Sequence, residues 1–273
     1  MVSVKTTWET GLHQSWRLLP KPSEHLRPFL ESDGLTQDDI LAKLPYEAAR
    51  SRSGGSSPDP KRYRDSRQVY ETAGLLFEDE TGVVRVTALG KTTLRWLSIV
   101  NEKNASILGR HAAYALAACQ LRNPLGAGKK FDASVTVFPF AFIWRAMLAL
   151  DGWITTDELN RAIFKVRNES ELHSAIAKIS ESRTDGDLST LGSETVTGAG
   201  KDDRIIPYMA IASFGWTIIS DKKQGEGVYR VKTDSYLLLK EASAVKHRHQ
   251  DFASKQEYIE RITRAAALPE DLR

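Results

Sequence analysis

One order of secondary-structure signals occurs twice in this chain of 273 residues, and it limits the folds that the chain can adopt. In each copy, helical stretches lead to a glycine, two short apolar segments around a turn, and a threonine that opens another helix. These landmarks are Gly74, 75–77 and 83–87 in the first copy, and Gly215, 216–219 and 227–233 in the second. Helices that lead into a β-hairpin are typical of a winged helix. We therefore predict a mainly α protein with small β-hairpins, an α+β fold of tandem winged-helix (helix-turn-helix) units joined by a helical linker.

Helix-end signals support this reading. Thr36 has the residue type of an N-cap, and the helix that follows carries acidic residues in its first turn. A second helix is expected over 61–72, because Gly74 is placed as a C′ glycine. In the second copy Pro139 suits the first position of a helix, and Thr155 and Glu158 have the spacing of a capping box. Further helices are expected over 170–183 and 203–214.

Two stretches rich in turn-forming residues divide the chain. Residues 51–60 combine Ser, Gly and Pro, and residues 184–201 are rich in Gly, Ser and Thr. We expect 184–201 to be the least ordered internal loop. The predicted division is an N-terminal winged-helix subdomain over 1–100, a basic helical linker over 101–135, and a second winged-helix subdomain with a C-terminal helix over 136–273.

Several protein classes conflict with the sequence. The longest uncharged apolar run, 133–144, is shorter than the roughly 20 residues that a membrane helix needs. The N-terminus does not resemble a signal peptide, so we expect a cytoplasmic protein without a membrane partner. The single cysteine, Cys119, excludes a disulfide framework and is expected to be a buried, inert thiol.

The distribution of charge along the chain, rather than the net charge of +3, indicates a nucleic-acid partner. Between residues 50 and 67 basic side chains outnumber acidic ones by four. They are Arg50, Arg52, Lys61, Arg62, Arg64 and Arg67, against Asp59 and Asp65. They cover a loop and the first turns of the helix that would enter the major groove of DNA. We predict that this helix, including Gln68, contacts double-stranded DNA; the alternative is a solvated charged helix face.

Helical spacing divides the roles within this cluster. Arg64 and Arg67 are three residues apart, which predicts a shared face and contacts with base edges. Lys61 and Arg62 are expected on phosphates. Weaker DNA-binding candidates are Lys129 and Lys130 in the linker, and Lys222 and Lys223 at the turn of the second hairpin.

No catalytic motif is evident. The sequence lacks a P-loop, a dinucleotide fingerprint, a nucleophile elbow and HExxH. A magnesium-dependent nuclease needs carboxylates and a lysine on adjacent strands, whereas 59–61 and 221–223 fall in a loop and a turn. We therefore predict no catalytic residue, metal ligand or cofactor in this chain. His247 and His249 are expected on the solvated surface of a charged C-terminal helix.

A resemblance sharpens the functional expectation. The apolar Pro-Phe segment 138–143, the segment 154–159 (ITTDEL) and the helix 176–183 that ends at an arginine follow one another in this order. This order resembles the DNA-recognition domain of type IIS restriction endonucleases of the BpuJI and AlwI kind, which use tandem winged-helix subdomains. The resemblance implies sequence-specific recognition of double-stranded DNA in a restriction or phage-defence system. It also implies a nuclease domain or subunit as a candidate partner, with Mg²⁺ needed only there.

Two alternatives share much of this evidence. A tandem winged-helix transcription regulator or plasmid replication initiator would have the same fold and the same basic helix. A protein-interaction module would use the same grooves and wings without binding DNA. The sequence leaves open whether the chain is the recognition part of a restriction enzyme, and the target site cannot be carried over from the resemblance.

Overall fold

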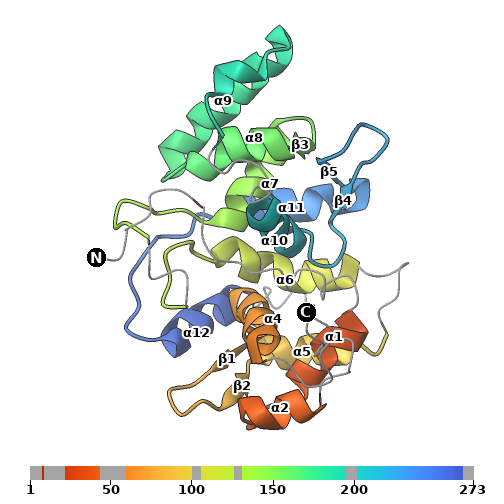
Figure 1. Ribbon diagram of the computed structural model, residues 1–273, viewed down its shortest axis with the longest axis vertical. Coiled ribbons are helices and arrows are strands. Elements are labelled where there is room, and N and C mark those ends of the chain that lie inside the picture. Colours follow the sequence, from red (N-terminus) through yellow and green to blue (C-terminus); the bar gives the residue numbers. More distant parts are fainter. Residues whose placement is uncertain are drawn as a thin grey trace.

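The computed structural model describes Trp8 and residues 22–43, 60–99, 106–125, 131–194 and 202–266. Helices predominate, and the strands of these residues form one antiparallel sheet of two strands and another of three (Figure 1). The predicted α+β class with small hairpins is therefore confirmed. No helix of the described residues is both long enough and apolar enough to cross a lipid bilayer.

The first unit has the order of elements expected of a winged helix. Its elements are α1 (Pro22–Leu30), α2 (Gln37–Lys43), α4 (Pro60–Thr72), β1 (Leu76–Glu78), β2 (Val84–Val86) and α5 (Ala88–Trp96). Gly74 follows α4 with a φ of 73°, a left-handed conformation that glycine adopts readily. Thr87 caps α5 by accepting a hydrogen bond from the backbone N–H of Gly90. Thr36 forms an isolated antiparallel bridge to Val83, so the chain entering α2 lies beside the hairpin.

The second unit repeats this order with a fuller sheet. Its elements are α7 (Pro139–Ala149), β3 (Trp153–Thr155), α8 (Thr156–Arg161), η3 (Ile163–Lys165), α9 (Glu169–Asp185), η4 (Leu188–Leu191), α10 (Asp202–Ala212), β4 (Ile218–Ser220), β5 (Val228–Val231), η6 (Thr233–Ser235) and α11 (Tyr236–Ala244). The strand order is β3-β5-β4, with all pairs antiparallel. Pro139 at the start of α7 and the Thr155–Glu158 capping box are both confirmed. The sequence reading missed β3, because three residues are too few to show alternation and only pairing with β5 makes them a strand.

The expected loop over 184–201 is wrong in its first part. Helix α9 continues through Asp185 and ends at Gly186, whose φ is 69°. Asp187 then accepts a hydrogen bond from the backbone N–H of Ser189, and Leu188–Leu191 form η4. The glycine and the aspartate therefore act as helix caps here rather than as markers of an irregular loop. Residues 195–201 lie outside the described residues.

The predicted linker helix is a central part of the core. Helix α6 (Ser106–Ala118) packs against α5 of the first unit and against α7 and α11 of the second (Figure 1). Its small residues permit close approach, since a Cβ on Gly215 would lie 2.0 Å from the backbone nitrogen of Gly109. One continuous apolar core consequently runs through both units.

Cys119, just after α6, matches its predicted state. The thiol is buried and donates a hydrogen bond to the carbonyl oxygen of Thr72 at 3.0 Å. Burial raises the pKa of the thiol to about 12, which removes the thiolate needed for reactivity.

Both ends of the described chain cross to the opposite unit. Trp8, from the segment assigned to the first unit, donates its indole N–H to the carbonyl of Val166 at 2.8 Å and stacks on Phe164 at 5.1 Å. Helix α12 (Lys255–Ala265), assigned to the second unit, packs against α6 and β1 and places Ile262 beside Gly74. In Figure 1 α12 accordingly lies beside β1, away from α11. The two units are thus held together by segments exchanged between them.

Residues 245–254, which we call the strap, connect α11 to α12 without helical structure. The expectation that His247 and His249 lie on a solvated helix is wrong, because both imidazoles are half-buried around Phe138, with ring centroids 5.8 and 6.1 Å away. Gln120, buried at the end of the α6 segment, anchors the strap. Its side chain donates to the carbonyl of Gln250 at 2.8 Å and accepts from the N–H of Gln250 at 3.1 Å.

The strap makes stability depend on pH. Burial, reinforced by Arg122, lowers the pKa of His249 from 6.5 to about 4, and burial together with Arg261 lowers the pKa of His247. As the pH falls below 6.5, the unfolded chain takes up protons that the folded chain does not yet bind. The folded state should therefore lose stability as the pH falls from about 6.5 toward about 4.

This prediction can be tested by comparing urea unfolding midpoints at about pH 7 and about pH 5. We expect His249→Asn to show a smaller decline than the parent chain. We compare the change in midpoint between the two pH values in the parent and in the variant. This comparison cancels contributions that both chains share, such as that of Glu71, whose pKa is raised by burial and whose effect has the opposite sign. His173→Asn, at an exposed position of α9, is the matched control. An identical change in midpoint with pH for the parent and His249→Asn would contradict the prediction.

Candidate nucleic-acid interface

Helix α4 is held against the first unit by one stripe of aromatic residues. Tyr63 stacks on Phe29 of α1 with ring centroids 5.8 Å apart, and Tyr70 meets the same ring edge-on at 5.0 Å. Both tyrosines are fully buried. Positions 63, 67 and 70 follow the 3.6-residue period, so Arg67 also falls on the packed side. The outer side of α4 carries Arg64, which is exposed, and Gln68, which is half-buried.

Arg67 lies in an ion-pair network between α4 and the first hairpin. Its Nε lies 3.3 Å from Glu71 Oε1, and its Nη1 pairs with Glu78 on β1. Glu71, whose side chain is only 4% exposed, also accepts a hydrogen bond from the backbone N–H of Glu78. The guanidinium of Arg67 therefore joins the helix to the hairpin.

The structure thus separates two residues that the spacing argument grouped together. Arg64 and Arg67 differ by about 300°, which leaves roughly 60° between them, enough to place one outward and the other over Tyr63. The sequence did hold a signal for the role of Arg67: Glu71 stands four residues later, the spacing of a helical ion pair. Arg64, which is exposed, and Gln68, which is half-buried, stand four residues apart on the outer side of α4.

The hairpin of the first unit is acidic. Glu78, Asp79 and Glu80 follow one another along β1 and into the turn. Asp79 is bound by the hydroxyl and N–H of Thr81, the N–H of Val83 and the guanidinium of Arg85, and these interactions hold the pKa of its carboxyl well below its usual range. Fixed carboxylates disfavour phosphate, so this hairpin does not suit contacts with a DNA backbone.

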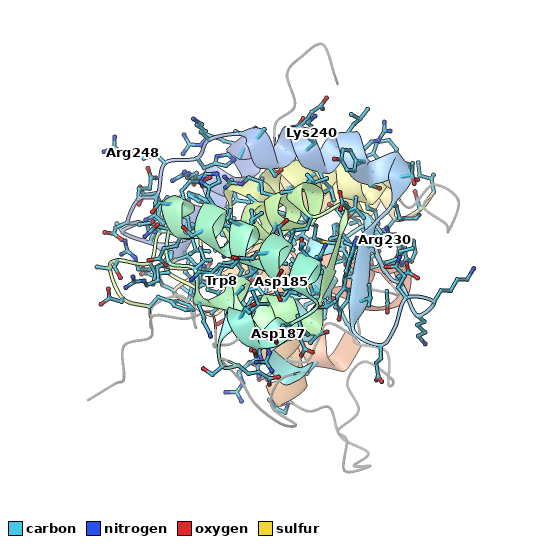
Figure 2. All side chains as sticks on the ribbon, turned by 90° about the horizontal axis from the view of Figure 1, so that it is seen from above. Trp8, Asp185, Asp187, Arg230, Lys240 and Arg248 are labelled. Carbon is cyan, nitrogen blue, oxygen red and sulfur yellow. The ribbon has the colours of Figure 1, made fainter. Side chains whose placement is uncertain are left out.

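The second unit has the opposite charge arrangement. Lys222 and Lys223 are exposed at the turn between β4 and β5, while Arg230 is held by Asp221 at 2.9 Å. Helix α10, which precedes this hairpin, begins with two aspartates in sequence. Asp185 at the end of α9 and Asp187, which caps η4, lie toward the viewer in Figure 2. Within the described part of the chain, Lys222 and Lys223 are therefore the unpaired cations of this hairpin, with the exposed Glu226 close to them in sequence.

Several predicted contacts cannot be placed. Arg50, Arg52, Lys129 and Lys130 lie outside the described residues, and so do the side chains of Lys61 and Arg62. Their assignment to DNA stays a prediction, as does that of the residues on α4 and the second hairpin.

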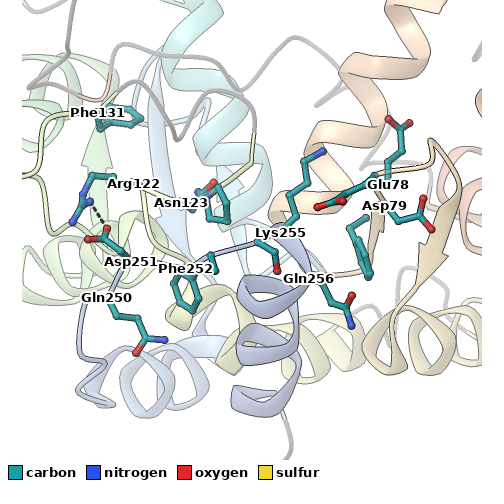
Figure 3. Close-up of a pocket in the computed structure, with 15 residues that line it drawn as sticks. Glu78, Asp79, Arg122, Asn123, Phe131, Gln250, Asp251, Phe252, Lys255 and Gln256 are labelled. Carbon is teal, nitrogen blue, oxygen red and sulfur yellow. Dashed lines mark hydrogen bonds and ion pairs between the residues drawn. The ribbon is translucent and has the colours of Figure 1, made fainter.

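A cavity of about 560 Å³ lies between the first hairpin, the segment after α6, and the strap (Figure 3). Phe77, Glu78 and Asp79 line one side of it, and Arg122 and Asp251 form an ion pair on another. Carboxylates outnumber cationic side chains in the lining, so this cavity does not suit a phosphate. Across the part of the chain that the structure describes, no three His, Cys, Asp or Glu side chains converge in a way that could hold a metal ion.

Comparisons with known proteins bear on the fold. A scan against models of protein families and a search of curated proteins found no match. Among solved structures, the chain is similar to the BpuJ1 endonuclease binding domain, which was crystallised in complex with pyrene- and phenanthrene-modified DNA. The TM-score is 0.57 with 11% sequence identity, over 88% of this chain and 91% of that one. The chain therefore shares the fold of that domain over most of its length.

Proposed function

We propose that this chain recognises a specific sequence in double-stranded DNA as the recognition module of a restriction or phage-defence system. The observation that carries the proposal is the placement of α4. It occupies the recognition-helix position of a winged-helix-like unit, its aromatic side is packed inward, and its basic first turns include the exposed Arg64. The similar solved domain is a DNA complex, which adds support at the level of the fold.

The side chains of α4 suit direct readout. Arg64 can donate two hydrogen bonds to O6 and N7 of guanine, and Gln68 can bond N6 and N7 of adenine. Lys61 and Arg62, at the start of the helix, suit phosphates, as do Lys222 and Lys223 on the second hairpin. In this arrangement Arg67 is a positioning residue that sets the angle between α4 and its hairpin. Cleavage, and the Mg²⁺ that it requires, would belong to a nuclease domain or subunit that acts with this chain.

Selection of bound duplexes from a random library tests the proposal and identifies the site. On the selected site, Arg64→Ala is expected to cost about 1–3 kcal/mol of binding free energy and to relax discrimination at one position. Lys61→Ala should weaken all duplexes about equally and reduce the salt slope by about one. Arg95→Ala, at an exposed position of α5, is the matched control and should leave both unchanged.

Different results would point elsewhere. Equal losses on selected and random DNA for Arg64→Ala would show that α4 only positions the chain and that readout lies elsewhere. A chain that binds no duplex even at low salt, where phosphate contacts are strongest, would favour the protein-interaction module instead.

A further inference from the structure

A second cavity, of about 480 Å³, lies on the second unit where α7, α9 and α11 meet the strap. Its apolar lining includes Phe138 and Ala141 of the α7 segment. Its polar lining consists of Arg145, Glu169, His173, Ser243, Lys246 and His247. None of these residues belongs to the proposed DNA interface on α4 and the second hairpin, so the cavity needs an explanation of its own.

Two nitrogen atoms of this lining are buried without a partner. Arg145 Nε and His247 Nε2 have no hydrogen-bond partner among the described residues. The guanidinium of Arg145 is fixed in place, since its Nη1 pairs with Glu169 and its carbon lies 4.8 Å from the centre of the Phe142 ring. Buried polar atoms of folded proteins are nearly always satisfied, so two unpaired nitrogen atoms on side chains that line one cavity favour an acceptor that the described residues do not supply.

The charges around His247 also favour an anion. Groups that are cationic or can become so face it from α7, α9, the strap and α12: Arg145, His173, Lys246 and Arg261. Among the described residues that line the cavity, Glu169 is the one carboxylate, and Arg145 already pairs with it. The uncompensated charge is therefore positive, and protonation of either imidazole would increase it.

We propose that this cavity binds a phosphate group. Arginine presents planar donors that match the oxygens of a phosphate, with His247 and Lys246 as further donors. The cavity exceeds the size of the phosphate alone and falls in the usual range for small-molecule sites. The remaining volume leaves room for a sugar or base against Phe138 and Ala141. The site does not rest on the proposed DNA recognition, because it uses other residues.

Titration of the full chain with inorganic phosphate, followed by calorimetry and by the imidazole NMR signals, tests the site. We expect saturable binding that Arg145→Gln weakens about tenfold or more. Lys246→Gln, at an exposed position that carries little risk for folding, should weaken it as well. Lys240→Gln, an exposed lysine of α11 outside the cavity lining, is the matched control.

Sulfate, which stays a dianion, isolates the contribution of the histidine. It should bind more tightly at about pH 5.5 than at about pH 8, because a bound anion favours protonated His247. His247→Gln should remove most of this pH dependence. Equal sulfate affinities at the two pH values in the parent chain would remove His247 from the proposed site and overturn it as drawn.

The source of the phosphate is distinguished by competition. If a short duplex with 5′-phosphates displaces inorganic phosphate but an unphosphorylated duplex does not, the site takes a DNA end. Displacement by both duplexes indicates backbone phosphate, and displacement only by adenosine monophosphate indicates a free nucleotide. Each of these results supports the site. Absence of saturable binding by all probes, or equal affinities in the parent, Arg145→Gln and Lys246→Gln, would overturn it.

Discussion

Arg183→Ala is expected to lower the free energy of unfolding by about 3–5 kcal/mol, as the loss of one partner in a buried ion pair does. Arg183 binds both carboxylate oxygens of Glu158, at 2.7 and 2.9 Å, and Glu158 is only 2% exposed. The guanidinium also donates to the carbonyl oxygens of Leu150 and Trp153 and lies 3.5 Å from the centre of the Trp153 ring. Removing it leaves the buried carboxylate without its cationic partner, held among the described residues only by the backbone N–H of Thr155, and takes one donor from each of the two carbonyl groups.

Urea unfolding of the parent and variant measures this loss. Arg167→Ala is the matched control, because Arg167, which precedes α9, pairs with Glu171 in an exposed setting, where about 0.2–1 kcal/mol is typical. A double variant, Arg183→Ala with Glu158→Gln, should recover part of the loss by removing the unpaired charge. A loss below about 1 kcal/mol for Arg183→Ala would show that water can replace the guanidinium.

Trp8→Ala is expected to destabilise the chain by about 3–5 kcal/mol, the usual cost of truncating a buried tryptophan. Trp8 is fully buried and packs on Phe164 and Tyr208 of the second unit, with ring centroids at 5.1 and 5.9 Å. The substitution also removes the hydrogen bond from the indole to Val166. The substitution would leave a new cavity in the second unit, among residues more than a hundred positions away from Trp8 in the sequence.

The location of the destabilised segments distinguishes the effect of Trp8→Ala from a general loss of stability. Amide hydrogen exchange should rise first in η3 and α10, which surround the indole, rather than in α4 of the first unit. Trp96→Ala, at a half-buried position of α5, is the control and should cost less. Faster exchange confined to the first unit in Trp8→Ala would contradict the observed packing.

The sequence by itself determined the elements that depend on neighbouring residues. Pro139, the Thr155–Glu158 box, Gly74 and Gly215 act within one helical turn or one tight turn, so their residue types reveal their roles. The two hairpins were predictable for the same reason, to within one or two residues at their ends. These local signals were enough to predict the α+β class and the repeated order of elements.

Only the tertiary structure decided which charges are free and which helices are buried. Arg64 and Arg67 look alike in the sequence, yet Glu78, eleven residues further along, holds one of them between helix and hairpin. The alanines of α6 became core because the two units close around them, and Trp8 and α12 cross to opposite units. Hydrophobic burial and ion pairing depend on which surfaces meet in space, and a pattern along the chain does not contain that information for residues far apart in sequence.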